Sequence, residues 1–205
     1  MDQRRFVLAT RNDDKVREIQ HILMVEEWEL LSLQDFPKTD KVEEDGKTFL
    51  DNALKKAHAA FDWTGIASLA DDSGLEVNAL RSDPGVLSSR FAGENASDHE
   101  NNEKLLNLLT GVPEKDRKAR FRCVVALVDD KEERWVEGFC EGMILQEYRG
   151  EGGFGYDPVF YVPDKGKTFA EMSEEEKNTI SHRRRAFRKM AKLIKEYDLG
   201  RDTIK

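Results

Sequence analysis

The chain has 205 residues, 39% of them hydrophobic and 36% charged, with a formal net charge of -8. This composition is typical of a folded globular protein, and its acidic excess argues against general nucleic-acid binding, which depends on surplus Lys and Arg. No apolar run approaches the roughly 20 residues that cross a bilayer, and no signal-peptide pattern precedes the first strand, so we expect a cytoplasmic protein with no membrane partner.

The first predicted elements are a strand and two helices. We predict the strand over residues 6–9 and a helix directly after it, with Asn12 or Asp13 as the N-cap. A second helix is predicted over residues 49–63, because apolar residues recur there at helical spacing. Gly65 is expected to end this helix.

The middle of the chain alternates between extended segments and turns. A strand over residues 66–69 is predicted to end in a turn over residues 70–74. The period-two alternation after that turn indicates a further strand over residues 75–80. The Leu-rich stretch 101–109 predicts a helix.

The last part of the chain combines strands with a basic helix. Residues 119–128 predict a central strand, because both faces become apolar towards its end. Residues 135–139 and 143–148 predict an antiparallel pair joined at Glu141-Gly142. The final helix is predicted over residues 181–197. We find no repeats and no linker, so all 205 residues are predicted to form one α/β domain.

Two adjacent aspartates, Asp71 and Asp72, stand where the strand over residues 66–69 is predicted to end. Mg²⁺ prefers oxygen ligands and usually takes one or two carboxylates together with substrate phosphates. A carboxylate that is left over can act as general base on an attacking water. The same residues are equally consistent with an Asx-type turn that only closes the strand.

An acidic cluster, Glu43-Glu44-Asp45, precedes the helix over residues 49–63. Acidic residues near a helix start complement the helix dipole, which is the simpler interpretation. The alternative is that Glu44 shares a metal ion with Asp72.

Residues 10–15 join the first strand to the first helix. Such helix N-termini bind phosphate through unpaired N–H groups and the helix dipole, and Lys15 can add a point charge. The segment is not a P-loop, because it lacks the glycines of that motif. Ordinary helix capping explains the same residues otherwise.

The stretch from Gly150 to Gly155 matches the dinucleotide-binding pattern G-x-G-x-x-G. That pattern requires a helix after it, whereas residues 156–163 contain prolines and are expected to be extended. We therefore predict a glycine-rich loop that lets the backbone approach a ligand. Phe154 can stack on a base there, and Asp157 can accept N–H bonds.

Lys177 and the segment Ser181-His182-Arg183 supply local positive charge that the overall balance lacks. We expect Ser181 to cap the final helix and His182 and Arg183 to lie at its rim, where their donors meet a purine carbonyl. The alternative is a solvated basic helix face.

Together and in this order, these segments resemble the inosine triphosphate pyrophosphatase family. The matching blocks are residues 8–12 (LATRN) with Lys15 and Glu18, 44–49 (EDGKTF) with Asn52-Ala53 and Lys56-Ala57, 70–77 (ADDSGLEV), 84–86 (PGV) with Ser89-Arg90, 152–158 (GGFGYDP), and 169–172 (FAEM) with Lys177 and 181–183 (SHR). That family hydrolyses non-standard purine triphosphates such as ITP, dITP and XTP to the nucleoside monophosphate and pyrophosphate. The resemblance implies an elongated, two-lobed α/β fold, in which helices flank a long mixed central sheet and the active-site cleft lies between the lobes. It also implies a homodimer.

The resemblance assigns roles to individual residues. Glu44 and Asp72 would bind Mg²⁺, Asp72 would also accept a proton, and Ser73 would contact the substrate. The residues that would hold the triphosphate are Thr10, Arg11, Asn12, Asp13, Asp14 and Lys15. Those that would bind the nucleotide and its base are Phe154, Gly155, Tyr156, Asp157, Lys177, His182 and Arg183.

The chain departs from the family pattern in two places. Arg81-Ser82-Asp83 precede Pro84 where many members have Gly-Gly, which alters a turn. Arg11 stands where many members have Gly, which adds a charge beside the proposed phosphate site. Neither change removes a proposed ligand.

Two alternatives remain open from the sequence. A Maf-type pyrophosphatase would act on pyrimidine or modified nucleotides, and the Ser-His-Arg block disfavours it. A nucleic-acid-binding module would use the basic helix from His182 to Lys195, and the acidic balance elsewhere opposes that function.

Overall fold

The computed structural model describes residues 4–24, 28–38, 40 and 42–202. Within these residues it contains helices and strands that alternate along much of the chain. The strands are β1 (Arg4–Leu8), β2 (Trp28–Ser32), β3 (Ser68–Val77), β4 (Lys118–Val128), β5 (Glu133–Ile144), β6 (Phe160–Val162) and β7 (Lys167–Thr168). The helices are α1 (Asp13–Leu23), α2 (Phe49–Thr64), α3 (Asp98–Leu108), α4 (Glu174–Ile180) and α5 (His182–Asp202).

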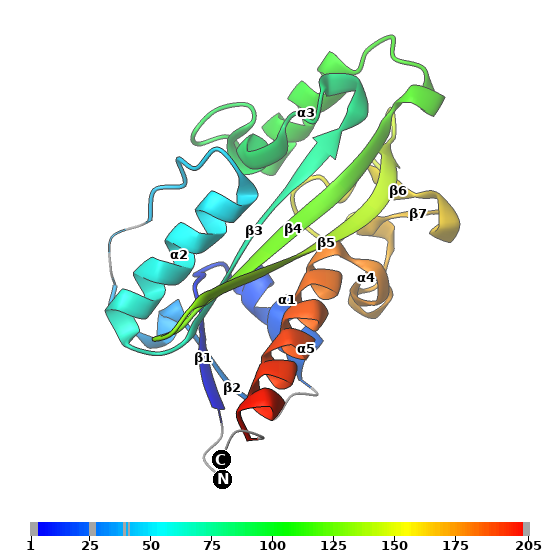
Figure 1. The fold of residues 1–205 in the computed structure, drawn as a ribbon. Coiled ribbons are helices and arrows are strands. Elements are labelled where there is room, and N and C mark those ends of the chain that lie inside the picture. Colours follow the sequence, from blue (N-terminus) through cyan, green and yellow to red (C-terminus); the bar gives the residue numbers. More distant parts are fainter. Residues whose placement is uncertain (1–3, 25–27, 39, 41, 203–205) are drawn as a thin grey trace. The chain divides into compact units, whose positions relative to one another are not determined.

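The strands form one seven-stranded sheet in the order β2-β1-β3-β4-β5-β6-β7 (Figure 1). Strand β1 pairs in parallel with both β2 and β3, whereas β6 is antiparallel to β5 and β7. A mixed sheet flanked by helices confirms the predicted α/β class. The elongated shape and the cleft between two lobes stay predictions.

The chain divides into two compact units. The first contains Met1–Asp72, Cys123–Gly138 and Arg183–Lys205, and the second contains Ser73–Arg122 and Phe139–His182. The chain therefore passes from one unit to the other within strands β3, β4 and β5, and again between His182 and Arg183 at the start of α5. A single domain over the whole chain stays a prediction.

The core of the first unit lies between the sheet and two helices. Alternation in β1 sends Phe6 and Leu8 to the same face, and both are buried against residues of α1 and α5 such as Ile19 and Phe187. Helix α2 lies over the other face of the sheet in Figure 1 and buries Phe49 and three alanines. Burial of apolar surface on both faces is what stabilises this part of the sheet.

The core of the second unit is rich in aromatic residues. Phe121 of β4 contacts Phe160 edge-on and lies parallel to Phe169, with ring centroids 4.6 Å and 5.6 Å apart. Helix α3 adds Leu105, which is fully buried in the same cluster. Such aromatic pairs prefer particular ring orientations, and they stabilise the core beyond the contribution of the apolar area that they bury.

Local capping explains where α1 and α2 begin and where α2 ends, and it confirms the predicted Asn12 cap and Gly65 stop. The Asn12 side chain accepts a hydrogen bond from the Lys15 N–H at 3.0 Å and caps α1. Thr48 caps α2 through a capping box with Asp51. At the other end of α2, Gly65 takes a left-handed conformation with φ of 67°, which a residue without a Cβ adopts at little cost.

The predicted turn over residues 70–74 is wrong, because β3 continues through it as one strand to Val77. Its two aspartates are buried, and each is paired with a lysine side chain. Pairing removes the main cost of burying a carboxylate. Residues that locally favour a turn are therefore held in the sheet by side-chain partners distant in sequence.

The predicted antiparallel pair at residues 135–139 and 143–148 is also wrong. Residues 133–144 form the single strand β5, and Gly142 lies inside it. A Cβ on Gly142 would lie 2.5 Å from the Phe160 ring and 2.6 Å from the Tyr161 carbonyl oxygen. This glycine permits close approach of β6 rather than a turn.

A left-handed turn follows β3 at the first departure from the family pattern. Arg81 and Ser82 have φ of 55° and 75°. Their N–H groups donate to the carbonyls of Asn78 and Val77 at 3.1 Å and 3.0 Å, which fixes the turn. Two residues with a Cβ thus occupy positions where glycine would be less strained.

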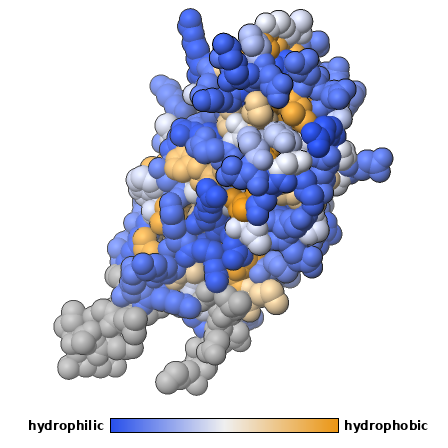
Figure 2. All heavy atoms as spheres, turned by 90° about the vertical axis from the view of Figure 1, so that its right-hand side faces the viewer, coloured by the Kyte–Doolittle hydropathy of each residue, from blue (hydrophilic) through white to orange (hydrophobic). Residues whose placement is uncertain are grey.

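The face of the molecule in Figure 2 is mostly hydrophilic, with hydrophobic side chains in small separate groups. This is as expected for a chain in which 36% of residues are charged. None of the helices in the described ranges is long and apolar enough to span a membrane.

Candidate active site

Residues 10–15, the predicted phosphate-binding segment, contribute one of their six side chains to the surroundings of the two aspartates in β3. Lys15 Nζ lies 3.2 Å from Asp71 Oδ2. Arg11 instead donates to the Leu33 and Pro37 carbonyls at 2.8 Å and 3.3 Å. Lys15 is therefore the member of the segment that the structure joins to the candidate site in β3.

The remaining polar side chains of this segment hold the turn and the helix start. Thr10 Oγ1 accepts from the Asn12 N–H at 3.2 Å, and Asn12 caps α1. Asp13 accepts a hydrogen bond from Gln34, and Asp14 pairs with Arg17. These contacts shape the loop, and the structure does not bring these side chains to the carboxylates of β3.

Asp71 belongs to a buried ion network in the first unit. Besides Lys15, its Oδ2 accepts from Arg183 Nε at 3.3 Å, and Arg183 Nη1 donates to Glu18 Oε2. Both Asp71 and Arg183 are almost completely buried. Two cations and two carboxylates from β3, α1 and α5 thus compensate one another.

Asp72 belongs to a second group in the same unit. Its Oδ1 lies 3.0 Å from Lys56 Nζ, and its Oδ2 accepts from Asn52 Nδ2 at 3.2 Å. Lys56 Nζ also lies 3.3 Å from Glu44 Oε1. Two carboxylates therefore converge on one cationic position, as the proposed pairing of Glu44 with Asp72 requires.

The two aspartates differ in their protonation behaviour. Burial alone would raise the pKa of Asp71, but the positive charges of Lys15, Arg183 and Lys56 outweigh it and hold this pKa far below its usual value. Burial dominates for Asp72 and raises its pKa, although Lys56 partly offsets the rise. Asp71 is thus fixed as a carboxylate, whereas Asp72 is a better proton acceptor than an exposed aspartate.

Lys56 remains a cation although it is buried. Burial opposes its charge, but attraction by Asp72, Asp71 and Glu44 is stronger in sum and raises the pKa of Lys56. Lys56 and Asn52 are four residues apart on α2 and so share one helix face. Both residues belong to the sequence block that resembles the family, but the sequence predicts no role for them; their spacing beside an acidic cluster is the signal that points to one.

The second unit holds the predicted glycine-rich loop. No helix follows Gly155, in keeping with our rejection of a dinucleotide fold, and the chain turns into β6. Asp157 Oδ2 accepts from the Phe154 N–H at 2.9 Å and lies 2.5 Å from Lys177 Nζ. Asp157 is buried, so it fixes the loop from within.

Lys177 and Phe154 also contact each other directly. The Lys177 ammonium lies 4.8 Å from the centroid of the half-buried Phe154 ring and 5.2 Å from that of Phe169. A cation over an aromatic face at this distance is attracted by the ring quadrupole. The structure thus brings Phe154, Asp157 and Lys177 together, and their role in binding the base stays a prediction.

Tyr156 ties the loop to the segment after β3. Its hydroxyl donates to the Ser88 carbonyl at 2.8 Å. Burial, with a smaller effect of the Asp98 charge, raises the pKa of Tyr156 well above its usual value, so the phenol stays neutral. Ser73 lies in β3 of the same unit and is half-buried.

The expected rim position of His182 and Arg183 is wrong, because both side chains are buried, at 4% and 2% exposed. The His182 ring stacks on Phe121 of the second unit, with centroids 4.7 Å apart. Arg183 enters the ion network of the first unit. Ser181 ends α4 by donating its N–H to the Lys177 carbonyl, and α5 starts directly after it.

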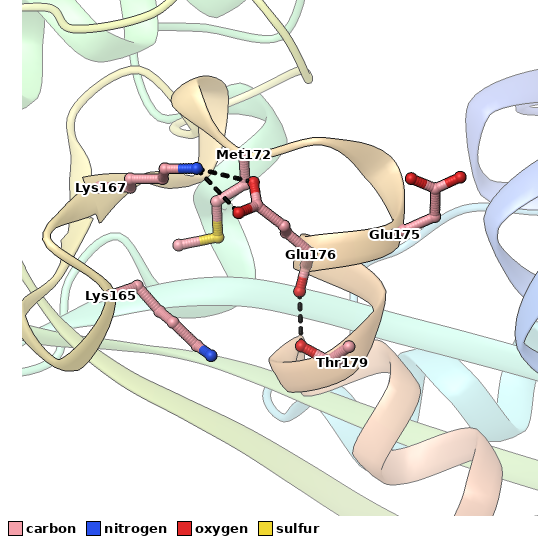
Figure 3. A pocket seen from close by; sticks show the side chains of 6 residues that line it. All are labelled: Lys165, Lys167, Met172, Glu175, Glu176 and Thr179. Atoms are coloured by element: carbon pink, nitrogen blue, oxygen red, sulfur yellow. Dashed lines mark hydrogen bonds and ion pairs between the residues drawn. The ribbon is translucent and has the colours of Figure 1, made fainter.

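A separate surface hollow of about 340 Å³ lies in the second unit. Figure 3 shows Lys167 paired with Glu176 at this hollow, with Met172 beside them. None of the predicted site residues lines it.

The fold and these groups define an α/β protein with an acidic, lysine-lined site suited to a cation and phosphate. The family model described as "Ham1 family" matches residues 6–193 of the chain. This chain belongs to the Ham1 family.

Relatives in other organisms cover nearly the whole chain. The dITP/XTP pyrophosphatase of Desulforamulus reducens is 53% identical over 191 residues, which are 93% of this chain and 95% of that protein. The dITP/XTP pyrophosphatase of Geobacter sulfurreducens is 55% identical over 183 residues, 89% of this chain and 92% of that protein.

Solved structures of similar proteins share the fold. The Ham1 protein of Coxiella burnetii has a TM-score of 0.86 at 44% identity, covering 95% of this chain and 100% of its own. The Staphylococcus aureus Ham1 protein has a TM-score of 0.85 at 40% identity with the same coverage.

Proposed function

We propose that this chain is a nucleoside triphosphate pyrophosphatase that hydrolyses ITP, dITP and XTP to the nucleoside monophosphate and pyrophosphate. The observation that carries the proposal is the convergence of Glu44 and Asp72 on one cationic position, 3.3 Å and 3.0 Å from Lys56 Nζ. Membership of the Ham1 family and relatives named dITP/XTP pyrophosphatase support the substrate class.

The donor set at this position fits Mg²⁺. Glu44 and Asp72 offer oxygen ligands, and Mg²⁺ commonly binds through two carboxylates with water and substrate phosphate filling the remaining positions. In the described part of the chain, no group of three His, Cys, Asp or Glu side chains gathers as an all-protein metal site. The proposed ligands are therefore Glu44 and Asp72, completed by the substrate.

The chemistry divides among a few residues. Bound Mg²⁺ would neutralise charge that develops on the phosphate oxygens. Lys15 and Lys56 add positive charge for the triphosphate, and both are already held by carboxylates of β3. Asp72 accepts the proton of the water that attacks between the α- and β-phosphates.

We assign selection of the base to the second unit, where Lys177 lies over the ring of Phe154 in the loop over residues 154–157. A site that offers donors to O6 of hypoxanthine or xanthine meets an amino group in adenine, which leaves those donors unpaired. Such a mismatch is worth roughly 10⁴-fold in specificity.

Pyrophosphate release from ITP, XTP, GTP, ATP and UTP with Mg²⁺ tests the substrate class. We expect kcat/KM for ITP to exceed that for ATP by roughly 10⁴-fold. Equal turnover of ATP and ITP would refute the specificity, and a preference for UTP would favour the Maf-type alternative. In the same assay Asp72→Asn should lose at least about 10²-fold in kcat, and a fully active variant would remove Asp72 from its role.

The proposal extends to a cytoplasmic location and to a homodimer, of which the family resemblance implies the homodimer. Light scattering on the purified chain should give a mass twice that of one chain. A monomer at micromolar concentration would contradict this part alone.

A further inference from the structure

We propose that Asp98 and Asn102 of helix α3 are positioning residues for the loop over residues 154–157, here called the base-binding loop. They hold Gly155, and with it this loop, in the conformation that binds the nucleotide. The proposal rests on the function proposed above, because it assigns that loop to the nucleotide base. Neither residue belongs to the sequence blocks that carry the family resemblance. Both lie in the second unit, as does the loop.

The contact uses both backbone groups of Gly155. Its N–H donates to Asp98 Oδ2 at 2.6 Å, and its carbonyl oxygen accepts from Asn102 Nδ2 at 2.8 Å. Asp98 and Asn102 are four residues apart, so they project from one face of α3. One helix face thus fixes both sides of a single residue in the loop.

These two hydrogen bonds, here called the clamp, restrict the backbone most effectively at a residue such as Gly155. Its φ is 63°, and a Cβ there would meet no atom within 4 Å, so its conformation and not its space demands glycine. A glycine has a wide choice of backbone conformations when it is unrestrained. Fixing its two peptide groups therefore decides how the flanking Phe154 and Tyr156 are presented.

The orientation of the Asn102 amide follows from its partners. Nδ2 donates to two carbonyl oxygens, those of Gly155 and Asp98, the latter at 2.9 Å. A flipped amide would place its oxygen against both carbonyls, which excludes that arrangement. Asn102 is therefore a donor to the loop.

Asn102 is retained at a cost to stability. The residue is 2% exposed, and its Oδ1 is buried without a hydrogen-bond partner among the described residues. A buried acceptor without a partner is unfavourable, so a residue that only filled space here would better be apolar. This points to the contact with Gly155 as the reason for an amide.

Other contacts hold the loop at its neighbours and leave Gly155 to α3. Asp157 anchors the Phe154 N–H, and Tyr156 is bonded to Ser88. Loss of the clamp should therefore loosen Gly155 without unfolding the loop. The expected consequence is weaker binding of the nucleotide with little change in the chemical step.

The test compares four variants of the full chain in ITP hydrolysis with Mg²⁺. Asp98→Ala removes the acceptor and should raise KM roughly tenfold, the effect of about one charge-assisted hydrogen bond, with kcat within about twofold of wild type. Asp98→Asn keeps an acceptor oxygen and should restore KM to within about threefold of wild type. Asn102→Leu should raise KM as Asp98→Ala does.

Ser97→Ala is the matched control for helix stability. Ser97 caps the same helix by accepting from the Glu100 N–H, whereas the side chains hydrogen-bonded to Gly155 are those of Asp98 and Asn102. It should lower the melting temperature at least as much as Asp98→Ala and leave KM unchanged. An equal rise in KM for Ser97→Ala, or none for Asp98→Ala, would overturn the proposal.

Amide hydrogen exchange separates this inference from the proposed function. Exchange at Gly155 should be faster in Asp98→Ala than in wild type and in Ser97→Ala, whether or not ITP is the substrate. Unchanged exchange at Gly155 refutes the clamp. A wild-type chain that does not hydrolyse ITP refutes the function while leaving the exchange result to decide the clamp.

Discussion

Asp71 and Asp72 are neighbours in β3, yet their carboxylates bind different lysines. Asp71 Oδ2 lies 3.2 Å from Lys15 Nζ, whereas Asp72 Oδ1 lies 3.0 Å from Lys56 Nζ. Successive residues of a strand point to opposite faces of a sheet, which separates the two carboxylates. The pair is thus divided into a buried structural anchor, Asp71, and the proposed metal ligand and proton acceptor, Asp72.

Replacing Asp71 should destabilise the fold in a pH-dependent way. Asp71→Asn leaves the buried Arg183 short of one counter-charge and should cost about 3 kcal/mol of unfolding free energy at pH 7. Because the folded-state pKa of Asp71 lies below its ordinary value, its stabilisation is complete above about pH 4 and is lost as the pH falls below that value.

Urea unfolding of wild type and Asp71→Asn at pH 7 and pH 3 measures this difference. The gap between the two proteins should narrow at pH 3. The exposed Asp130, replaced by Asn, serves as control and should change stability by less than about 0.5 kcal/mol. A gap that is absent at pH 7, or that widens in acid, would show that Asp71 is not held as a carboxylate.

Replacing Glu44 should weaken metal use. Glu44→Gln removes one of two charged ligands and should raise the Mg²⁺ concentration for half-maximal activity by roughly tenfold. Its neighbour Glu43 is exposed, and Glu43→Gln changes the net charge identically. Activity titrated with Mg²⁺ after chelator treatment gives the two midpoints, and equal midpoints for both variants would rule out Glu44 as a ligand.

Adding one methyl group to the base-binding loop should impair substrate binding. Gly153 has φ of 75°, and a Cβ there would lie 2.0 Å from Asp157 Oδ2, the atom that holds the Phe154 N–H. Gly153→Ala must displace Asp157 and should raise KM for ITP by tenfold or more, roughly the loss of that bond.

Gly166→Ala provides the comparison, because Gly166 has φ of 65° and open space around its Cβ position. It should cost about 1 kcal/mol of stability through backbone strain alone and leave KM unchanged. Similar KM values for the two variants would mean that the Asp157 anchor does not control binding.

Replacing Ser82 by glycine should stabilise the protein. Ser82 has φ of 75°, a conformation that costs a residue with a Cβ roughly 1–2 kcal/mol. The greater freedom of glycine in the unfolded chain returns about 0.4–1 kcal/mol, so the net gain should be about 0.5–1 kcal/mol.

Thermal unfolding should show Ser82→Gly melting about 2 °C above wild type. Ser89 is exposed and is not among the residues with positive φ, so Ser89→Gly should lower the melting temperature instead. A lower melting temperature for Ser82→Gly would contradict the strain at this turn.

The features that can be predicted from the sequence are those that depend on local chemistry. Helices α1 and α2 are predicted correctly from the Asn12 N-cap, the Gly65 C-cap and the helical spacing of apolar residues. Capping and periodicity act within a few residues, so they can be read from the sequence. The Gly-rich loop was separated from a dinucleotide fold by the prolines that follow it. These signals lie in neighbouring residues and need no knowledge of the tertiary structure.

The errors arose where distant partners override local preference. Asp71 and Asp72 favour a turn until Lys15 and Lys56 neutralise them, which keeps β3 continuous. The sequence predicts Arg183 at a rim, but Asp71 and Glu18, far away in sequence, allow its burial. A basic residue at a helix start carries no local sign of such pairing.

The products formed from ITP test the central claim most directly. Phosphorus NMR of a Mg²⁺ reaction mixture distinguishes cleavage between the α- and β-phosphates from loss of the terminal phosphate. We expect inosine monophosphate and pyrophosphate in equal amounts, with no diphosphate intermediate. Accumulation of inosine diphosphate and orthophosphate would contradict it.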